Sequence, residues 1–101
     1  PLITAAVEAS RGYIVTYQGA TAITSYFSRS DGMTRNWSDV WAGSIPYAQA
    51  VAVPCDQGKT LWGHGVGMSA SGAICMANEG KTSEEILTYF YTGVEVERIW
   101  E

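Results

Sequence analysis

The stretch Gly63-His64-Gly65-Val66-Gly67-Met68-Ser69 decides how the second half of this chain folds. Three glycines alternate with larger residues, so the backbone can adopt positive φ and approach another segment or a ligand closely. Small and apolar residues then recur at helical spacing through residues 70–77, which predicts a helix from about Ser69 that ends at Gly80. We therefore expect a tight turn that leads into a closely packed helix.

A second helix is predicted to begin at Thr82, because Thr82-Ser83-Glu84-Glu85 has the spacing of a capping box. Its apolar face, which we expect to be buried, consists of Ile86, Leu87 and Phe90. The helix should reach about Tyr91 and stop at Gly93. Residues 94–99 include apolar residues that alternate with charged ones, which predicts a closing strand with one exposed face.

The first half of the chain predicts a β-hairpin. Residues 12–17 and 20–27 are rich in β-branched and aromatic side chains and flank the turn Gln18-Gly19. Residues 1–10 suit a short helical turn, and residues 28–47 a long ordered loop. We therefore predict an α+β fold, in which the hairpin and the closing strand belong to a small mixed sheet and both helices pack on one side of it. Residues 1–101 are expected to form a single domain.

The composition excludes several classes of function. Of the 101 residues, 47% are hydrophobic, which is enough for a core. The net charge is −4 and the six Lys and Arg residues are spread thinly, so we expect no nucleic-acid binding. The longest stretches without charge, such as residues 42–55, contain Gly, Ser, Pro and Gln, so no membrane span is predicted. A neutral ligand fits this composition better.

Cys55 and Cys75 leave three states open: one disulfide, two reduced buried thiols, or metal ligands together with His64. A structural zinc site usually needs four ligands, and the patterns C-x-x-C and H-E-x-x-H do not occur. We therefore expect structural cysteines, either reduced or disulfide-linked, with no metal and no cofactor.

Taken alone, the glycine-rich stretch allows more than one interpretation. The spacings G-x-G-x-x-G and G-x-x-x-x-G-K-[ST] of nucleotide-binding loops are absent. A His64 ring that is buried in a tight turn and satisfies its own hydrogen bonds is the plainer alternative to a ligand contact.

The glycine-rich stretch and four other parts of the chain together match the sequence motifs of a known family. The stretch from Gly63 to Ser69, followed by Gly72-Ala73 and Met76-Ala77, resembles the Gly-His-Gly-Val-Gly-Met-Ser-Gln-Tyr-Gly-Ala signature of the SpoIID/LytB (stage II sporulation protein D) family of peptidoglycan-degrading proteins. Further matches follow the order of the family: Ala9-Ser10-Arg11-Gly12, residues 26–32, Asp39-Val40-Trp41 with Pro46-Tyr47, and residues 80–87. Ala70 and Ser71 depart from the family, which usually has Gln and often Tyr there, and this puts one polar ligand contact in doubt.

The resemblance implies the C-terminal part of a domain similar to lytic transglycosylases. These enzymes cut the β-1,4 bond between N-acetylmuramic acid and N-acetylglucosamine and leave a 1,6-anhydro end. One carboxylic acid suffices if burial raises its pKa toward the working pH. The family's presumed acid, a Glu before a Met-Pro pair, lies on an earlier helical segment. We therefore expect the acid upstream of Pro1, no catalytic residue in this chain, and no cleavage by this fragment alone.

The resemblance also implies which residues of this chain contact the substrate in the cleft where the acid would act. His64 is expected to hydrogen-bond a sugar hydroxyl or N-acetyl group, and the N–H groups of Gly65 and Gly67 to support charge near the scissile bond. Asp31 is a further candidate contact, although an Asp before Gly is more often a turn residue. The candidate hydroxyl contacts are Ser28, Ser30 and Ser69.

We expect residues 63–69 and 28–32 to line one partly exposed cleft. Nearby aromatic residues would either stack on sugars or anchor the loop, with Trp41 the more structural and Trp37 the more exposed. The other two aromatic candidates are Trp62 and Tyr47.

Three classes of function remain at this stage. The first is the retained part of a lytic transglycosylase, and the second is a non-catalytic glycan-binding or amidase-enhancing module of the same family. The third is an unrelated α+β domain with a glycine-rich turn. The first two imply an extracytoplasmic protein whose partners are peptidoglycan glycan strands and a segment or chain that supplies the missing helix.

Overall fold

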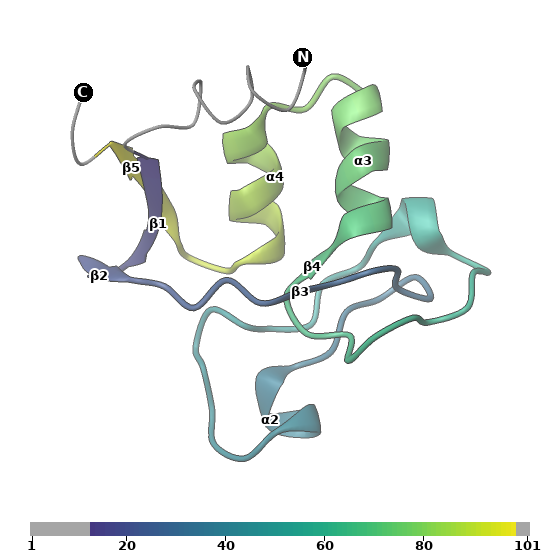
Figure 1. Ribbon diagram of the computed structural model, residues 1–101, viewed down its shortest axis with the longest axis horizontal. Coiled ribbons are helices and arrows are strands. Elements are labelled where there is room, and N and C mark those ends of the chain that lie inside the picture. The colour runs from purple at the N-terminus through teal and green to yellow at the C-terminus, as the bar shows by residue number, and fades with distance from the viewer. Residues whose placement is uncertain (1–12, 99–101) are drawn as a thin grey trace.

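The computed structural model describes residues 13–98 and shows two small sheets with two helices beside them (Figure 1). This is the α+β fold that the sequence predicts. The helical turn predicted for residues 1–10 and the last residue of the predicted closing strand, Ile99, lie outside the described residues. None of the described helices is long and apolar enough to cross a membrane.

The predicted hairpin is formed by β1 (Tyr13–Tyr17) and β2 (Ala20–Thr21). Gln18 and Gly19 in the turn both have positive φ, 50° and 85°, and this combination gives a two-residue turn the same twist as its strands. β5 (Glu95–Arg98) pairs antiparallel with the other edge of β1. The order β2-β1-β5 confirms the predicted closing strand.

The prediction that residues 20–27 form one hairpin strand is wrong. β2 ends early, and β3 (Tyr26–Phe27) belongs to a second sheet, where it pairs in parallel with β4 (Met68–Ser69). The pairing depends on Gly67, because a Cβ at that position would lie 2.1 Å from the Ser25 carbonyl oxygen. The end of the glycine-rich stretch is therefore a strand that packs directly on the chain before β3.

Both predicted helices are present. α3 (Ala70–Asn78) begins after Ser69, whose side-chain oxygen accepts a hydrogen bond from the Gly72 N–H at 3.1 Å. α4 (Ser83–Phe90) begins after Thr82, and both hydrogen bonds of the predicted capping box are formed, at 2.8 and 3.1 Å. α4 contacts β5, and α3 lies beside α4, so both helices are on the same side of the three-stranded sheet (Figure 1).

The apolar core lies between α3, α4 and the three-stranded sheet. Its buried members are Tyr47, Val53, Ile86, Phe90, Tyr91 and Val94. Phe90 is 0% exposed and Ile86 is buried, as the helical periodicity predicts, while Leu87 is only partly buried. Burying a side chain of this size contributes roughly 1.5–3 kcal/mol.

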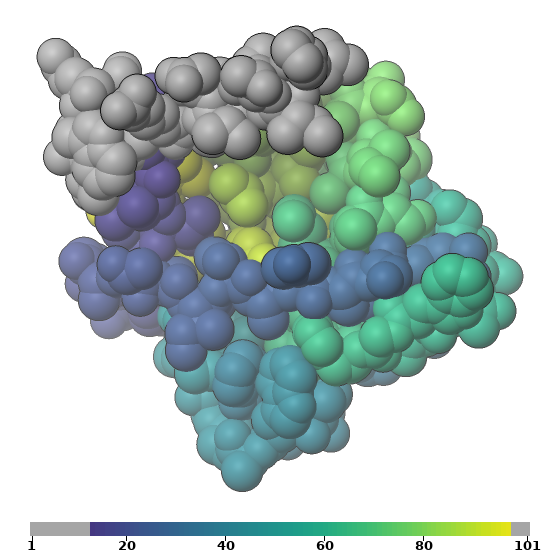
Figure 2. Space-filling model, in the orientation of Figure 1, coloured from purple at the N-terminus to yellow at the C-terminus, as the bar shows by residue number. Residues whose placement is uncertain are grey.

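The chain between β3 and β4, residues 28–67, is called the loop segment below. It contains two single-turn helices, α2 (Trp37–Val40) and η1 (Pro54–Asp56). α2 buries none of its residues and projects from the body of the molecule (Figure 2). Tyr47 anchors the segment as expected, because its ring is buried and its hydroxyl oxygen accepts the Ile23 N–H at 2.6 Å.

Candidate functional site

A buried carboxylate joins the parts of the chain that carry the predicted site. Asp56 of η1 is 0% exposed, and its Oδ2 accepts hydrogen bonds from the hydroxyl groups of Ser30 and Ser69, each at 2.6 Å. Its Oδ1 accepts the Ser71 hydroxyl at 2.8 Å and lies 3.6 Å from the Lys59 ammonium nitrogen. This Asp56 cluster ties the loop after β3, η1 and the start of α3 together.

The Asp56 cluster keeps its carboxylate ionised. Burial by itself raises the pKa of Asp56, but the hydrogen bonds from Ser30, Ser69 and Ser71 outweigh burial and lower the pKa to about 2. A carboxyl group that is ionised at neutral pH is a poor proton donor to a leaving group. Asp56 therefore serves as an acceptor that holds its neighbours in place.

The sequence did not single out Asp56, and it assigned Ser30 and Ser69 to ligand contact. Both serines are 0% exposed and both donate their hydroxyl hydrogens to Asp56. A ligand cannot reach either hydroxyl in this arrangement, because the serines turn inward around one shared acceptor. In the sequence, Asp56 lies in the turn cluster of residues 54–58 and has no feature that separates it from an ordinary turn residue.

The glycine-rich stretch runs beside the loop after β3, and the cleft expected between them stays a prediction. At its start, the Arg29 and Trp62 backbones exchange hydrogen bonds of 3.2 and 2.8 Å. Further along, a Cβ at Gly65 would lie 2.9 Å from Cγ of Arg35, and the Arg35 N–H donates to the Gly65 carbonyl at 2.7 Å. Gly65 and Gly67 are both buried. Because glycine has no side chain, Gly65 and Gly67 allow close packing within the protein. A contact between their backbone N–H groups and a substrate stays a prediction.

His64 is half-buried and held in one orientation. Its Nδ1 accepts the Val66 N–H at 3.0 Å, so the neutral ring carries its hydrogen on Nε2. The imidazole contacts the Phe27 ring on one side and the Trp41 ring on another, with centroid distances of 5.6 and 4.7 Å. The ring is therefore not fully buried, although its Nδ1 is satisfied within the turn as in the plainer alternative, and Nε2 is the ring atom left for a partner.

Two tryptophans extend the wall beside His64. The Trp37 and Trp41 rings meet edge to face at 4.6 Å. Trp41 is 38% exposed, whereas Trp37 is half-buried and donates its indole N–H to the Ala42 carbonyl at 3.2 Å. This reverses the expected roles, because Trp37 anchors the short helix and Trp41 presents its ring to solvent.

Asp31 and Ser28, the two remaining candidates, are exposed. The Asp31 carboxylate forms a two-point ion pair with Arg35, at 2.8 and 3.1 Å. The hydrogen bond from Arg35 lowers the pKa of Asp31, so it is a poor proton donor at neutral pH. The Ser28 carbonyl accepts the Ser71 N–H at 3.0 Å, which holds the loop on the start of α3 and leaves the Ser28 side chain exposed.

The two cysteines form a disulfide between η1 and α3, Cys55–Cys75. This decides between the states that the sequence left open. Within residues 13–98, these sulfur atoms and the Glu79 carboxylate are the one group that could hold a metal. Sulfur atoms bonded to each other are not thiolate ligands, so in this state the group has a structural role.

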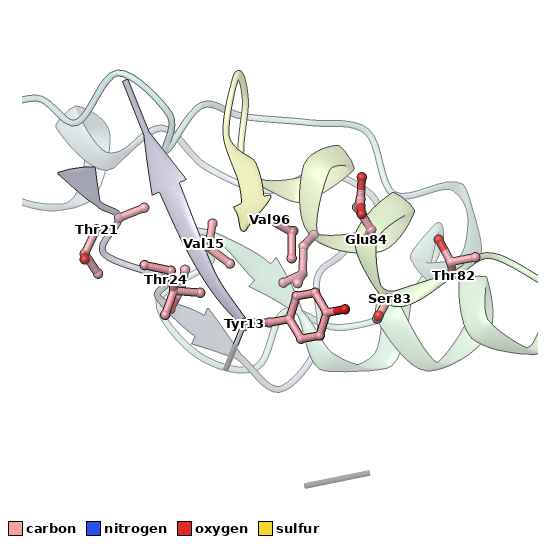
Figure 3. Close-up of a pocket in the computed structure, with 11 residues that line it drawn as sticks. Tyr13, Val15, Thr21, Thr24, Thr82, Ser83, Glu84 and Val96 are labelled. Carbon is pink, nitrogen blue, oxygen red and sulfur yellow. The ribbon is translucent and has the colours of Figure 1, made fainter. Parts of the chain in front are cut away.

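A separate hollow of about 1070 Å³ lies between β1 and the start of α4 (Figure 3). Its described lining is mainly apolar and hydroxyl-bearing, and it includes neither His64 nor any member of the Asp56 cluster. Glu84 at its rim lies in the first turn of α4, where the helix dipole favours a negative charge. The hollow is therefore not assigned to the predicted glycan site.

No protein-family model matches the chain. Two curated proteins are similar to it over 93% of its length, and both are called Stage II sporulation protein D. The protein of Bacillus subtilis (strain 168) is 26% identical, and that of Bacillus amyloliquefaciens is 24% identical.

The matched region covers 50% of each relative, so the chain spans about half the length of the curated relatives it matches. The aligned region of 173 residues is longer than the chain itself, which has 101. The relatives therefore carry additional residues between the parts that match. Similarity over nearly the whole chain agrees with the ordered blocks found in the sequence and supports the resemblance of this chain to the stage II sporulation protein D family.

Proposed function

We propose that this chain forms a glycan-contacting wall of a peptidoglycan-cleaving domain of the lytic transglycosylase type. The observation that carries the proposal is the arrangement of His64, whose Nδ1 is occupied by the Val66 N–H, whose Nε2 has no partner among the described residues, and whose ring lies against the partly exposed Trp41 ring. An N–H donor next to an aromatic face suits an amide-bearing sugar, because the ring covers the apolar face of the sugar and the donor binds its carbonyl or hydroxyl oxygen.

The ionisation of three described acids agrees with a catalytic acid on another segment. A lytic transglycosylase needs one carboxylic acid that protonates the leaving oxygen and then accepts the proton of the sugar's own 6-hydroxyl. The pKa values of Asp31, Asp56 and Glu85 are all lowered by hydrogen bonds, from Arg35, from three serines and from Thr82 respectively. Each of these carboxyl groups is therefore ionised at neutral pH and unsuited to the first proton transfer.

The Asp56 cluster supports the wall indirectly. It fixes the start of α3 and the loop after β3, and His64 lies on the segment that runs between them. A binding group held within a fraction of an ångström loses less conformational entropy on binding. The cluster thus preorganises the wall without touching a ligand.

The first experiment measures binding by the 101-residue chain. Chitotetraose, a neutral chain of N-acetylglucosamine, is titrated while tryptophan fluorescence and amide shifts are followed. We expect His64→Ala and Trp41→Ala each to weaken binding about five- to twentyfold, since lost contacts of this kind are worth ~1–2 kcal/mol. Ile74→Ala, on an exposed position of α3, is the matched control and should bind normally. Equal binding by His64→Ala and wild type would show that His64 has only a structural role.

The second experiment separates the first two classes of function, which the similarity to stage II sporulation protein D favours over an unrelated domain. Purified glycan strands are incubated with the chain and with the complete gene product, and 1,6-anhydro ends are sought by mass spectrometry. Cleavage only by the complete product, lost when its upstream acid is replaced, supports the split site. Cleavage by the chain alone, abolished by Asp31→Asn, would place the acid here. Binding without cleavage by either sample favours a glycan-binding or amidase-enhancing module.

Both functions place the protein outside the cytoplasm. The glycan strands that it would bind lie in the cell wall, so we propose an extracytoplasmic location. Fractionation of cells that express the complete product, with a cytoplasmic enzyme as reference, tests this proposal.

A further inference from the structure

Arg29 lies over the ring of Trp62, just before the glycine-rich stretch. The two residues face each other across an antiparallel backbone bridge, and the guanidinium carbon lies 4.5 Å from the centre of the Trp62 ring. The inner nitrogen, Nε, donates to the Thr60 carbonyl at 3.0 Å. The ring contact and the hydrogen bond together restrict the position of the guanidinium group.

The outer edge of this guanidinium group has no acidic partner among residues 13–98. The ion pairs there join Arg35 to Asp31 and Lys59 to Asp56. Arg35 is a useful contrast, because both of its terminal nitrogens bind oxygen atoms within the protein. Arg29 instead keeps Nη1 and Nη2 for an external acceptor, in a chain whose acids outnumber its Lys and Arg residues by ten to six.

The Arg29–Trp62 pair lies next to the proposed glycan wall. Trp62 is 59% exposed and directly precedes Gly63-His64. Phe27 lies two residues before Arg29 and His64 two residues after Trp62, and the Phe27 and His64 rings are in contact. The Arg29–Trp62 pair and the Phe27–His64 contact are therefore neighbours along the same two backbone segments.

We propose that Arg29 and Trp62 form a carboxylate-binding subsite of the glycan wall. The inference rests on the proposed function and names the chemistry of one end of the ligand. A planar guanidinium group binds a carboxylate through two parallel N–H···O hydrogen bonds, and the exposed indole covers the adjoining sugar face. Cell-wall glycan offers two such carboxylates, the lactyl group of N-acetylmuramic acid and the free acids of its peptide.

The test compares ligands that differ only in the carboxylate. Isothermal titration uses the 101-residue chain with chitotetraose, with an N-acetylglucosamine–N-acetylmuramic acid tetrasaccharide, with the methyl ester of that tetrasaccharide, and with its peptide-bearing form whose lactyl group is an amide. We expect the free acid to bind about three- to tenfold more tightly than its ester, as for a partly exposed two-point ion pair. A preference for the peptide-bearing form instead assigns the subsite to the peptide carboxylates.

Variants connect this preference to Arg29. Arg29→Gln should abolish the preference and leave the affinity for chitotetraose unchanged, while Arg29→Lys should restore only part of it because an ammonium group cannot make the paired hydrogen bonds. Lys81→Gln removes the same charge at an exposed position before α4 and should keep the preference. Circular dichroism checks that each variant is folded.

The possible failures are distinct. A preference that persists in Arg29→Gln, or equal binding of acid, ester and peptide-bearing form by wild type, overturns the subsite while chitotetraose binding still supports the glycan wall. Absence of binding to all four ligands overturns the glycan wall and the subsite together.

Discussion

Two parts of this molecule are held together by different chemistry. The three-stranded sheet, α3 and α4 enclose an apolar core in which Phe90 and Tyr91 have almost no exposed surface. The loop segment contributes Tyr47 and Val53 to that core, and it is held in addition by the Asp56 cluster, by the Cys55–Cys75 disulfide and by short backbone bridges. Apolar burial responds little to pH or to reductants. A carboxylate cluster, in contrast, responds to pH, and a disulfide responds to reductants.

This difference matters because the candidate site belongs to the loop segment. His64, Trp41 and Arg29 all lie in the part of the chain that depends on polar and covalent links. Changes to the core should therefore lower the stability of the whole molecule, while changes to the cluster or the disulfide should in addition disturb the candidate site.

The largest effect is expected from the core. Phe90→Ala should lower the free energy of unfolding by ~3–5 kcal/mol, because it removes a fully buried ring and leaves a cavity. Urea denaturation followed by circular dichroism measures the change. Thr88→Ala, at an exposed position on the same helix, should change stability by less than ~0.5 kcal/mol. A loss of under ~1 kcal/mol for Phe90→Ala would contradict the assignment of the core.

The disulfide should have the next largest effect, centred on the loop segment. Replacing both Cys55 and Cys75 by Ser removes a link that spans 20 residues, and the entropy of a closed loop of this size corresponds to ~3 kcal/mol. Hydrogen exchange followed by mass spectrometry should show faster exchange in residues 50–62 than in α4. Wild type in which a dithiol has reduced the disulfide is the matched sample, and it should show the same pattern of hydrogen exchange as the double variant. Uniform acceleration across both parts would show that they do not differ in this way.

The Asp56 cluster should make stability depend on pH. The pKa is lowered from an ordinary value of 3.8 to about 2 in the folded protein. The stabilisation is therefore fully present above about pH 4 and is lost as the pH falls toward 2, with a size on the order of 2 kcal/mol. Unfolding of wild type and Asp56→Asn is compared at pH 6 and pH 2. The gap between them should narrow at pH 2, and a constant gap would count against an ionised Asp56.

The smallest effect concerns the start of α4, which the core holds in place. Thr82→Ala removes the side-chain acceptor of the capping box and should cost ~1 kcal/mol. Ser83→Ala at the next position, which takes no part in the box, is the control. Thermal melts compare the melting temperatures of the two variants. Equal melting temperatures would mean that the cap contributes nothing measurable to stability.

The elements that the sequence predicted correctly are those with local signals. Residue spacing within a few positions specifies the turn at Gln18-Gly19, the capping box at Thr82 and the alternation of β5. Each depends on neighbours in the chain, so a single sequence contains the information.

The elements that the sequence missed depend on residues far apart in the chain. β3 pairs with β4, and Asp56 collects hydroxyl groups from Ser30 and Ser69. A serine that faces inward toward a carboxylate is identical in sequence to one that faces a ligand. For the same reason the relative exposure of Trp37 and Trp41 was reversed, because it depends on which ring packs under the other.

The pairing of β1 with β5 sets the mechanical behaviour of the domain. Tyr13 lies opposite Arg98, so the described chain enters and leaves at the same end of one antiparallel strand pair. Tension applied through these two ends loads the strand pair one hydrogen-bonded step at a time and peels it open, whereas force from opposite ends would shear all its bonds together. Adjacent ends also allow such a unit to sit within a longer polypeptide without spreading the segments that flank it.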